Sequence, residues 1–345
     1  MPDAVSPNSS ARFVPHPPTA DRFADSWYCY LHDPGFGFLK VAFLTYLNDR
    51  TDDGVQHGYV HLVHAPVDGP TREWDHWSRA VVSEAVPERG PDAFRFEIPG
   101  VATIDETVLS VTLPDAEARI ELTGPPVRYF PEPDPAASPF MGPLPELPSE
   151  QSHWFVQTLG TPASSTWRDD DGERSGSGLL YAERGWSVRQ AHGFCYLVAI
   201  SDAAKVVLTC GMPDDDHEVW AGRVLTADHD LTFLPFAGDI AVSSMVTSDE
   251  GRAEIRFTQG SIEVRVTAQA PLGDFYDQIT PSLTVFGAEH PVAKTMDARF
   301  TLEIRVDGSV VETHDLPQSI LEFGGVLYPT ELEGLTERPT YRYAD

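Results

Sequence analysis

Lysine, cysteine and long apolar runs are all scarce in this chain, and each scarcity excludes a class of protein. Only three of its 24 basic residues are lysines, against 53 acidic residues, and the formal net charge is -29. Nucleic acids and anionic membranes select basic surfaces, so neither is an expected partner. The acidic balance favours solubility and does not indicate a fold.

The three cysteines, Cys29, Cys195 and Cys210, lie within apolar stretches typical of strands. So small and odd a number does not form a disulfide framework, and we expect buried free thiols in a reducing compartment. No stretch approaches the roughly 18 apolar residues of a membrane span. The first residues lack the basic and apolar regions of a signal peptide. We therefore expect a cytoplasmic protein with no membrane span.

Sustained helical periodicity is also missing, except in residues 73–85, whose apolar side chains fall on one face and predict a short helix. Elsewhere, short runs of aromatic and β-branched residues alternate with Gly, Pro and Asp, which is the pattern of antiparallel strands. Asp307 and Gly308, between two alternating runs, predict a two-residue hairpin turn. The predicted fold class is all-β, and small antiparallel barrels of this kind can enclose one hydrophobic ligand.

The length of 345 residues favours two domains. Residues 1–22 are rich in Pro, Ser and Asn and predict a disordered tail. We expect an N-terminal β-domain over residues 23–186 and a C-terminal β-domain over residues 187–345. Residues 124–150 hold nine prolines and predict an irregular crossover within the first domain.

Motifs for metal or phosphate binding are weak. His57, His61 and His64 lie in one predicted strand, where His64 points away from the other two, so they do not converge as zinc ligands. The three aspartates at 169–171 lack the length and the bidentate terminal acid of a calcium loop. The Ser-Gly-Ser-Gly run at 175–178 precedes a strand rather than a helix, so it does not cradle phosphate. We predict no metal and no cofactor.

The stretch from 153 to 186 is the strongest candidate for a site. It begins with an aromatic strand, crosses a segment rich in Gly, Ser and Asp that predicts a surface loop, and ends in a second strand. Tyr181, Glu183 and Trp186 place an acid beside two large aromatic rings there. Most strand aromatics form the core, but buried Tyr and Trp need partners for their polar atoms. An aromatic wall suits an apolar, polyene-like or polycyclic ligand.

The run Gly-Leu-Leu-Tyr-Ala-Glu-Arg-Gly-Trp at 178–186 is similar to a motif of the lipocalin-like superfamily of carotenoid 1,2-hydratases, tocopherol cyclases and decalin-forming Diels–Alderases. Asp-Ser-Trp-Tyr at 25–28 resembles the opening strand of that superfamily, and the segment around Tyr328 resembles its closing segment. The resemblance covers most of residues 25–335. It implies two lipocalin-like antiparallel β-barrel or sandwich domains, with a ligand pocket at or near their junction.

Two departures from the hydratase pattern bear on mechanism. The hydratases carry an acid–His pair before the Trp, whereas Glu183 is followed by Arg184, and arginine stays protonated and cannot act as a base. The hydratases also carry a Tyr and an acid on a later strand, where this chain has Val-Leu-Thr-Cys-Gly at 207–211. The groups that would transfer protons in acid-catalysed hydration are therefore missing from these positions. We prefer the hypothesis of a cyclase that acts through the shape of its pocket.

The resemblance therefore implies a cofactor-independent cyclase of secondary metabolism or antibiotic biosynthesis, which closes a linear polyene polyketide by a Diels–Alderase-type [4+2] reaction. Confinement of the chain and a hydrogen bond to a carbonyl would lower the barrier. The predicted catalytic residues are Glu183, Tyr181 and Trp186. The predicted substrate-binding residues are Trp27, Tyr28, Tyr46, Trp154, Arg184, Tyr196 and Tyr328.

Three alternatives stay open. One is hydration or proton-initiated cyclisation of an isoprenoid, with Glu183 as the acid. Another is a non-catalytic carrier of a lipid or pigment, because lipocalin-like barrels often only bind. The third concerns Glu183 itself, which has a structural alternative as an ion pair with Arg184 or Arg189.

Overall fold

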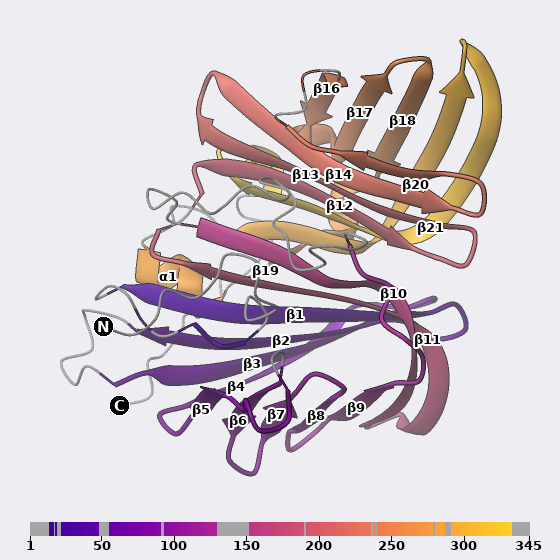
Figure 1. Cartoon of the computed structure of the whole chain (residues 1–345). Coiled ribbons are helices and arrows are strands. Elements are labelled where there is room, and N and C mark those ends of the chain that lie inside the picture. The colour runs from indigo at the N-terminus through magenta and orange to yellow at the C-terminus, as the bar shows by residue number, and fades with distance from the viewer. Residues whose placement is uncertain are drawn as a thin grey trace. The chain divides into compact units, whose positions relative to one another are not determined.

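The computed structural model describes residues 14–16, 18, 22–47, 55–90, 93–129, 152–189, 191–235, 238, 240–278, 280–286 and 291–332. It divides into two compact units. The first comprises Met1–Gln190 and Thr284–Phe286, and the second comprises Ala191–Leu283 and Gly287–Asp345. Both are built almost entirely of antiparallel strands, so the predicted all-β class is confirmed (Figure 1). Most of the predicted tail and of the proline-rich crossover lies outside the described residues.

Within the described residues, the first unit forms one 11-stranded sheet in the order β4-β3-β2-β1-β11-β10-β9-β8-β7-β6-β5. Its strands are β1 (Phe23–Asp33), β2 (Gly37–Leu47), β3 (His57–Pro66), β4 (Arg72–Ser78), β5 (Val82–Ala85), β6 (Phe94–Ile98), β7 (Ala102–Ile104), β8 (Val108–Thr112), β9 (Glu117–Leu122), β10 (Ser152–Asp169) and β11 (Gly172–Ser187).

This sheet curls, so that strands distant in its order meet around one apolar core. Trp27 of β1 stacks on Phe94 of β6 with ring centroids 5.6 Å apart. Trp74 of β4 meets Trp167 of β10 at 5.4 Å. Successive side chains of a strand point to opposite faces, so Trp27, Cys29 and Leu31 enter this core while Tyr28 and Tyr30 do not. We call the side of the sheet that lines the apolar cluster its core face.

The described part of the second unit forms a 10-stranded sheet in the order β15-β14-β13-β12-β21-β20-β18-β17-β16, with β19 paired to β20. Its strands are β12 (Gly193–Ile200), β13 (Ala204–Asp214), β14 (His217–Thr226), β15 (Asp230–Phe233), β16 (Ile240–Thr247), β17 (Arg252–Gln259), β18 (Ile262–Gln269), β19 (Tyr276–Gln278), β20 (Val292–Val306) and β21 (Ser309–Gly325). Within the described residues, the short helices are α1 (Pro281–Phe286) and the 3-10 turns Ser248–Glu250, Leu272–Asp274 and Thr330–Leu332.

The second sheet also curls onto itself. Phe233 of β15 stacks on Phe257 of β17 with centroids 4.3 Å apart, although the two strands lie near opposite ends of the sheet order. The predicted hairpin turn is confirmed between β20 and β21. Asp307 and Gly308 have φ of 50° and 77°, the left-handed pair that a two-residue type I′ turn requires.

The predicted helix over residues 73–85 is wrong, because this segment forms β4 and β5. Its apolar side chains lie on two faces of a sheet rather than on one face of a helix. Trp74 packs on Trp167 at the core face, whereas Trp77 meets Tyr59 on the other side at 5.4 Å. Strand β3 supplies the backbone partners of β4 along its whole length, and this pairing outweighs the local spacing.

The predicted surface loop within the 153–186 stretch is also wrong. Strands β10 and β11 form one long hairpin that turns at Asp170 and Asp171. Strand β9 pairs with the far half of β10, so the backbone of residues 163–168 has strand partners on both sides. Ala163 and Trp167 are buried and alternate with exposed residues. The Ser-Gly-Ser-Gly run lies inside β11.

The three cysteines are buried and free. Burial raises the pKa of the Cys195 thiol well above its ordinary value and that of Cys210 to about 12, so these thiols are not nucleophiles at neutral pH. Among the described residues, no helix combines the length and the apolar character needed to cross a membrane.

Candidate functional site

The face of the first sheet that lies opposite its core face carries a set of buried polar and aromatic side chains. They come from the neighbouring strands β11, β1, β2 and β3. The side chains of this polar face are Tyr181, Glu183, Tyr28, Tyr30, Lys40, Tyr46, His57, Tyr59 and His61. Except for the half-buried Tyr28, all of them are buried.

The register of the strands sets the rows of this face. Tyr181 of β11 lies opposite Tyr30 of β1, and Tyr30 lies opposite Lys40 of β2. The rings of Tyr30 and Tyr181 are 6.0 Å apart. In the next row, Glu183 lies opposite Tyr28. Two tyrosines and an ammonium group are thus side by side on three adjacent strands.

Glu183 is held as a hydrogen-bond acceptor. The Tyr181 hydroxyl donates to its Oε2 at 2.8 Å, and the Trp154 Nε1–H donates to the same oxygen at 2.7 Å. Donors aimed at a carboxylate stabilise its ionised form. This arrangement suits an anion that fixes two aromatic side chains better than it suits a proton donor.

Lys40 and His61 are diagonal neighbours on β2 and β3 of the same face. The His61 Nε2 lies 2.8 Å from Oε2 of Glu73 on β4. Burial lowers the pKa of His61 below its ordinary value, and the positive charge of Lys40 lowers it further, against the opposing effect of Glu73 and Asp75. A neutral imidazole beside a buried ammonium group is the result.

Tyr46 lies in an aromatic group at one end of the polar face. Its ring stacks on His57 at 5.5 Å and meets the edge of Trp77 at 5.7 Å. Trp77 in turn contacts Tyr59, whose hydroxyl donates to Oδ2 of Asp75 at 3.3 Å. These contacts fix the aromatic group, and its Tyr59 ring lies 6.2 Å from the ring of His61.

Arg184 points the other way, to the core face. Its Nη2 donates to Oδ2 of Asp25 at 2.8 Å, and its guanidinium lies 5.1 Å from the Trp27 ring and 4.7 Å from the Trp186 ring. Asp25 also accepts a hydrogen bond from the backbone N–H of His16. Burial raises the pKa of Asp25 to about 6, although Arg184 lowers it. Arg184 thus has Asp25 as its ionic partner at the core face.

The ten predicted site residues therefore occupy three places. Five of them lie on the polar face, namely Tyr181, Glu183, Tyr28, Tyr46 and Trp154. Trp27, Arg184 and Trp186 lie on the core face, so they do not form one wall with Tyr181 and Glu183. The remaining two, Tyr196 and Tyr328, belong to the second unit.

In the second unit, Tyr196 of β12 lies opposite Glu322 of β21, which forms an ion pair with the buried Lys294 of β20. The Tyr328 hydroxyl donates to Oδ1 of Asp277 at 2.8 Å, and its ring packs in the apolar core of this unit. Tyr328 therefore helps to close the second core. The predicted ligand pocket at the domain junction stays a prediction.

The sequence pattern missed Lys40, Asp25 and the His61–Glu73 pair. A signal for Lys40 exists, because it is one of only three lysines and stands inside the apolar run Phe-Leu-Lys-Val-Ala-Phe. A charge at such a position is buried only with polar partners. The alternation that places His57 and His61 on one face was a second signal, but Glu73 was hidden by the predicted helix.

Two pockets of the first unit differ widely in size. The smaller, of about 70 Å³, is lined by residues that include Cys29, Ala182 and Arg128. The larger, of about 700 Å³, is lined by residues that include Arg95 and Arg119. Pockets for organic ligands usually measure roughly 300–1,000 Å³. The smaller pocket therefore lies well below this range, and the larger one lies within it.

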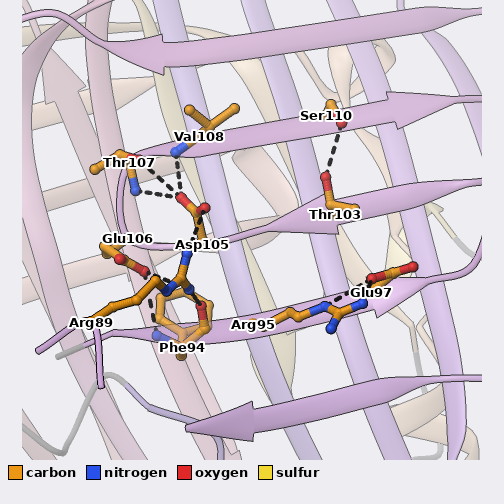
Figure 2. A network of polar contacts seen from close by, with 10 residues as sticks. All are labelled: Arg89, Phe94, Arg95, Glu97, Thr103, Asp105, Glu106, Thr107, Val108 and Ser110. Atoms are coloured by element: carbon orange, nitrogen blue, oxygen red, sulfur yellow. Dashed lines mark hydrogen bonds and ion pairs between the residues drawn. The ribbon is translucent and has the colours of Figure 1, made fainter. Parts of the chain in front are cut away.

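A second polar network joins the connection between β5 and β6 to the turn between β7 and β8 (Figure 2). Arg89 contacts Asp105 and Glu106 at 3.4 Å and 3.3 Å. Asp105 also accepts backbone hydrogen bonds from Thr107 and Val108, which hold its pKa below the ordinary value against the opposing effect of burial. These contacts define the turn between β7 and β8, and partly exposed ion pairs of this kind stabilise a fold only slightly.

The fold is that of a two-domain lipocalin-like β-protein, as the sequence resemblance implied. A protein assigned as AttH from Nitrosomonas europaea is 13% identical with a TM-score of 0.52, and the likeness covers 94% of this chain and 98% of that chain. CghA, crystallised with Sch210972, is 13% identical with a TM-score of 0.59, over 93% of each chain. At these identities the likeness establishes the fold alone. No protein-family model and no curated protein matches the chain.

Proposed function

We propose that this protein is a cofactor-independent natural-product cyclase that closes a linear polyene by a [4+2] cycloaddition. The observation that carries the proposal is the row of Tyr181, Tyr30 and Lys40 on the polar face, bordered by aromatic rings. The shared fold with CghA, which was crystallised with Sch210972, supports a small-molecule ligand. The proposed substrate is a hydrophobic polyene with a conjugated carbonyl group.

The chemistry needs two things from the protein. The flexible chain must be folded into one reactive conformer, and such preorganisation removes a large part of an entropic barrier. The carbonyl conjugated with the dienophile must be polarised, and donors fixed in a water-poor site do this well. Lys40 and the Tyr30 hydroxyl are the proposed donors, because the Tyr181 hydroxyl already donates to Glu183. Glu183 is the proposed positioning group, because it fixes Tyr181 and Trp154.

The placement of the other predicted residues revises their proposed roles. Trp27 and Trp186 flank Arg184 on the core face and would act by holding the Asp25–Arg184 pair. The isoprenoid alternative needs Glu183 as an acid, and the two hydrogen bonds that it accepts disfavour that role. The carrier alternative requires binding without turnover and is an outcome of the test below.

The test is to incubate the purified protein with a linear polyene that bears a conjugated carbonyl, and to follow ring closure by chromatography and mass spectrometry. We expect product to form faster than in buffer. Lys40→Met keeps an unbranched side chain of nearly the same length but removes the ammonium group, and it should lower the rate about 10²-fold or more, as the loss of one preorganised donor does. Lys205→Met, in the second unit, is the matched control and should leave the rate unchanged.

Thermal unfolding of both lysine variants would show that each is folded. If the polyene binds and product forms no faster than in buffer, the cyclase proposal fails and the protein is a carrier. If Lys40→Met turns over at the wild-type rate, the cyclase does not use this row of the polar face.

A further inference from the structure

We infer that His61, oriented by Glu73, accepts a proton from the substrate. The substrate would then carry an exchangeable proton next to its carbonyl group, as an enol or a 1,3-dicarbonyl does. This inference deepens the proposed function and rests on it for the identity of the site. A cycloaddition by itself requires only hydrogen-bond donors on the polar face. The inference adds a base to that face.

The geometry of the pair fixes which nitrogen is available. A carboxylate accepts hydrogen bonds and does not donate them, so the 2.8 Å contact with Glu73 places the hydrogen of His61 on Nε2. Nδ1 then carries the lone pair. This atom is buried and has no hydrogen-bond partner among the described residues, in a residue that is 4% exposed. An unsatisfied buried acceptor is costly, and a proton-bearing ligand would satisfy it.

His64 lies on the same strand as His61 but faces the core, and it serves as a comparison. The Nε2 of His64 lies 3.3 Å from the carbonyl oxygen of Phe36, and its Nδ1 lies 3.4 Å from Nη2 of Arg72. Both nitrogens of His64 therefore have partners inside the fold. His61 has a fold partner for one nitrogen, and Nδ1 is left for a ligand.

The charges around His61 suit a base. Lys40 faces it from β2, Glu73 and Asp75 face it from β4, and Tyr59 lies on its own strand with rings 6.2 Å apart. Burial and Lys40 keep the imidazole neutral at physiological pH, as a base must be. After proton transfer, Glu73 stabilises the imidazolium through the Nε2–H, in the manner of a carboxylate that orients a catalytic histidine.

The step balances within the site. A C–H or O–H bond of the substrate breaks, the proton moves to Nδ1 of His61, and the electron pair remains on the enolate oxygen. The ammonium group of Lys40, a diagonal neighbour on the same face, stabilises that oxygen. When the ring has closed, the imidazolium returns the proton, so no further reactant is consumed.

The experiment measures proton exchange without ring closure. Pentane-2,4-dione, a simple 1,3-dicarbonyl, is incubated in D₂O with the full chain, and loss of its C3 hydrogen is followed by proton NMR. We expect the wild-type protein to accelerate exchange over buffer, and His61→Gln to lower the protein-dependent rate by about 10²-fold, the usual contribution of a positioned base. Glu73→Gln should lower it less and shift its pH profile.

His76→Gln is the control variant, because His76 lies on β4 with its side chain on the opposite face from Glu73. It should keep the wild-type exchange rate. Because His61→Gln removes a buried side chain, a second measurement uses the wild-type protein alone. NMR of the ring nitrogens should show a neutral His61 with hydrogen on Nε2 at pH 7.

Equal exchange in wild type and folded His61→Gln would overturn the inference, as would an Nδ1–H tautomer or a protonated ring at pH 7. The two proposals fail separately. Accelerated exchange without cyclisation of a polyene would remove the cyclase and keep the base. Unchanged cyclisation in His61→Gln would remove the base and keep the cyclase.

Discussion

Glu183 and Arg184 are consecutive residues of β11 whose side chains lie on opposite faces of the sheet. Glu183 accepts hydrogen bonds from Tyr181 and Trp154 on the polar face. Arg184 pairs with Asp25 on the core face. One strand therefore supplies an anion to the candidate site and a cation to the packing of its own unit, and substitutions at the two positions should have different consequences.

Glu183→Gln should separate positioning from acid catalysis. The amide oxygen of Gln can accept the same two hydrogen bonds, so a cyclase that needs only the position of Tyr181 and Trp154 should lose less than about tenfold in rate. A residue that donates a proton in the reaction contributes about 10²–10⁴-fold. The measurement is the initial rate of product formation, together with ligand affinity. A loss of 10²-fold or more with retained affinity would favour the isoprenoid mechanism instead.

Asp25 should make stability depend on pH. Burial raises its pKa from 3.8 to about 6 in the folded protein, so the folded state holds this proton more tightly than the unfolded chain does. The stability it contributes is present below about pH 4 and is lost as the pH rises through 6. Relative to Asp25→Asn, the free energy of unfolding of the wild type should fall by up to about 3 kcal/mol between pH 4 and 6.5. Urea denaturation across this range is the measurement, and parallel curves for the two proteins would contradict the prediction.

Gly178→Ala should destabilise the first unit. A Cβ at this position would lie 2.1 Å from the carbonyl oxygen of His32, so β1 and β11 would have to move apart. Overpacking of this kind costs about 1–3 kcal/mol, which denaturant unfolding can resolve. Gly273→Ala is the control, because a Cβ there meets nothing within 4 Å. Equal stability of the two variants would show that the strands do not approach as closely as described.

The candidate site was partly predictable. Tyr181 and Glu183 were predicted because an acid stands at close spacing to two large aromatic residues, and the structure joins them through a hydrogen bond. Trp186 was grouped with them on sequence proximity, yet odd spacing from Glu183 places it on the core face. Lys40 and Glu73 belong to strands β2 and β4. The local sequence pattern does not show which strands pair with these two, so it could not place either residue beside His61.

Local patterns in the chain determine that it forms antiparallel strands, where the turn at Asp307 and Gly308 falls, and that residues two apart share a face. These features depend on alternation and backbone preference over a few residues, which short segments carry by themselves. Tertiary structure alone decides that Asp25 meets Arg184 across 159 residues and that Lys40 lies beside Tyr30 in line with Tyr181. Strand order and register follow from the burial of the whole apolar core, so they decide which buried charges meet and where the chemistry can occur.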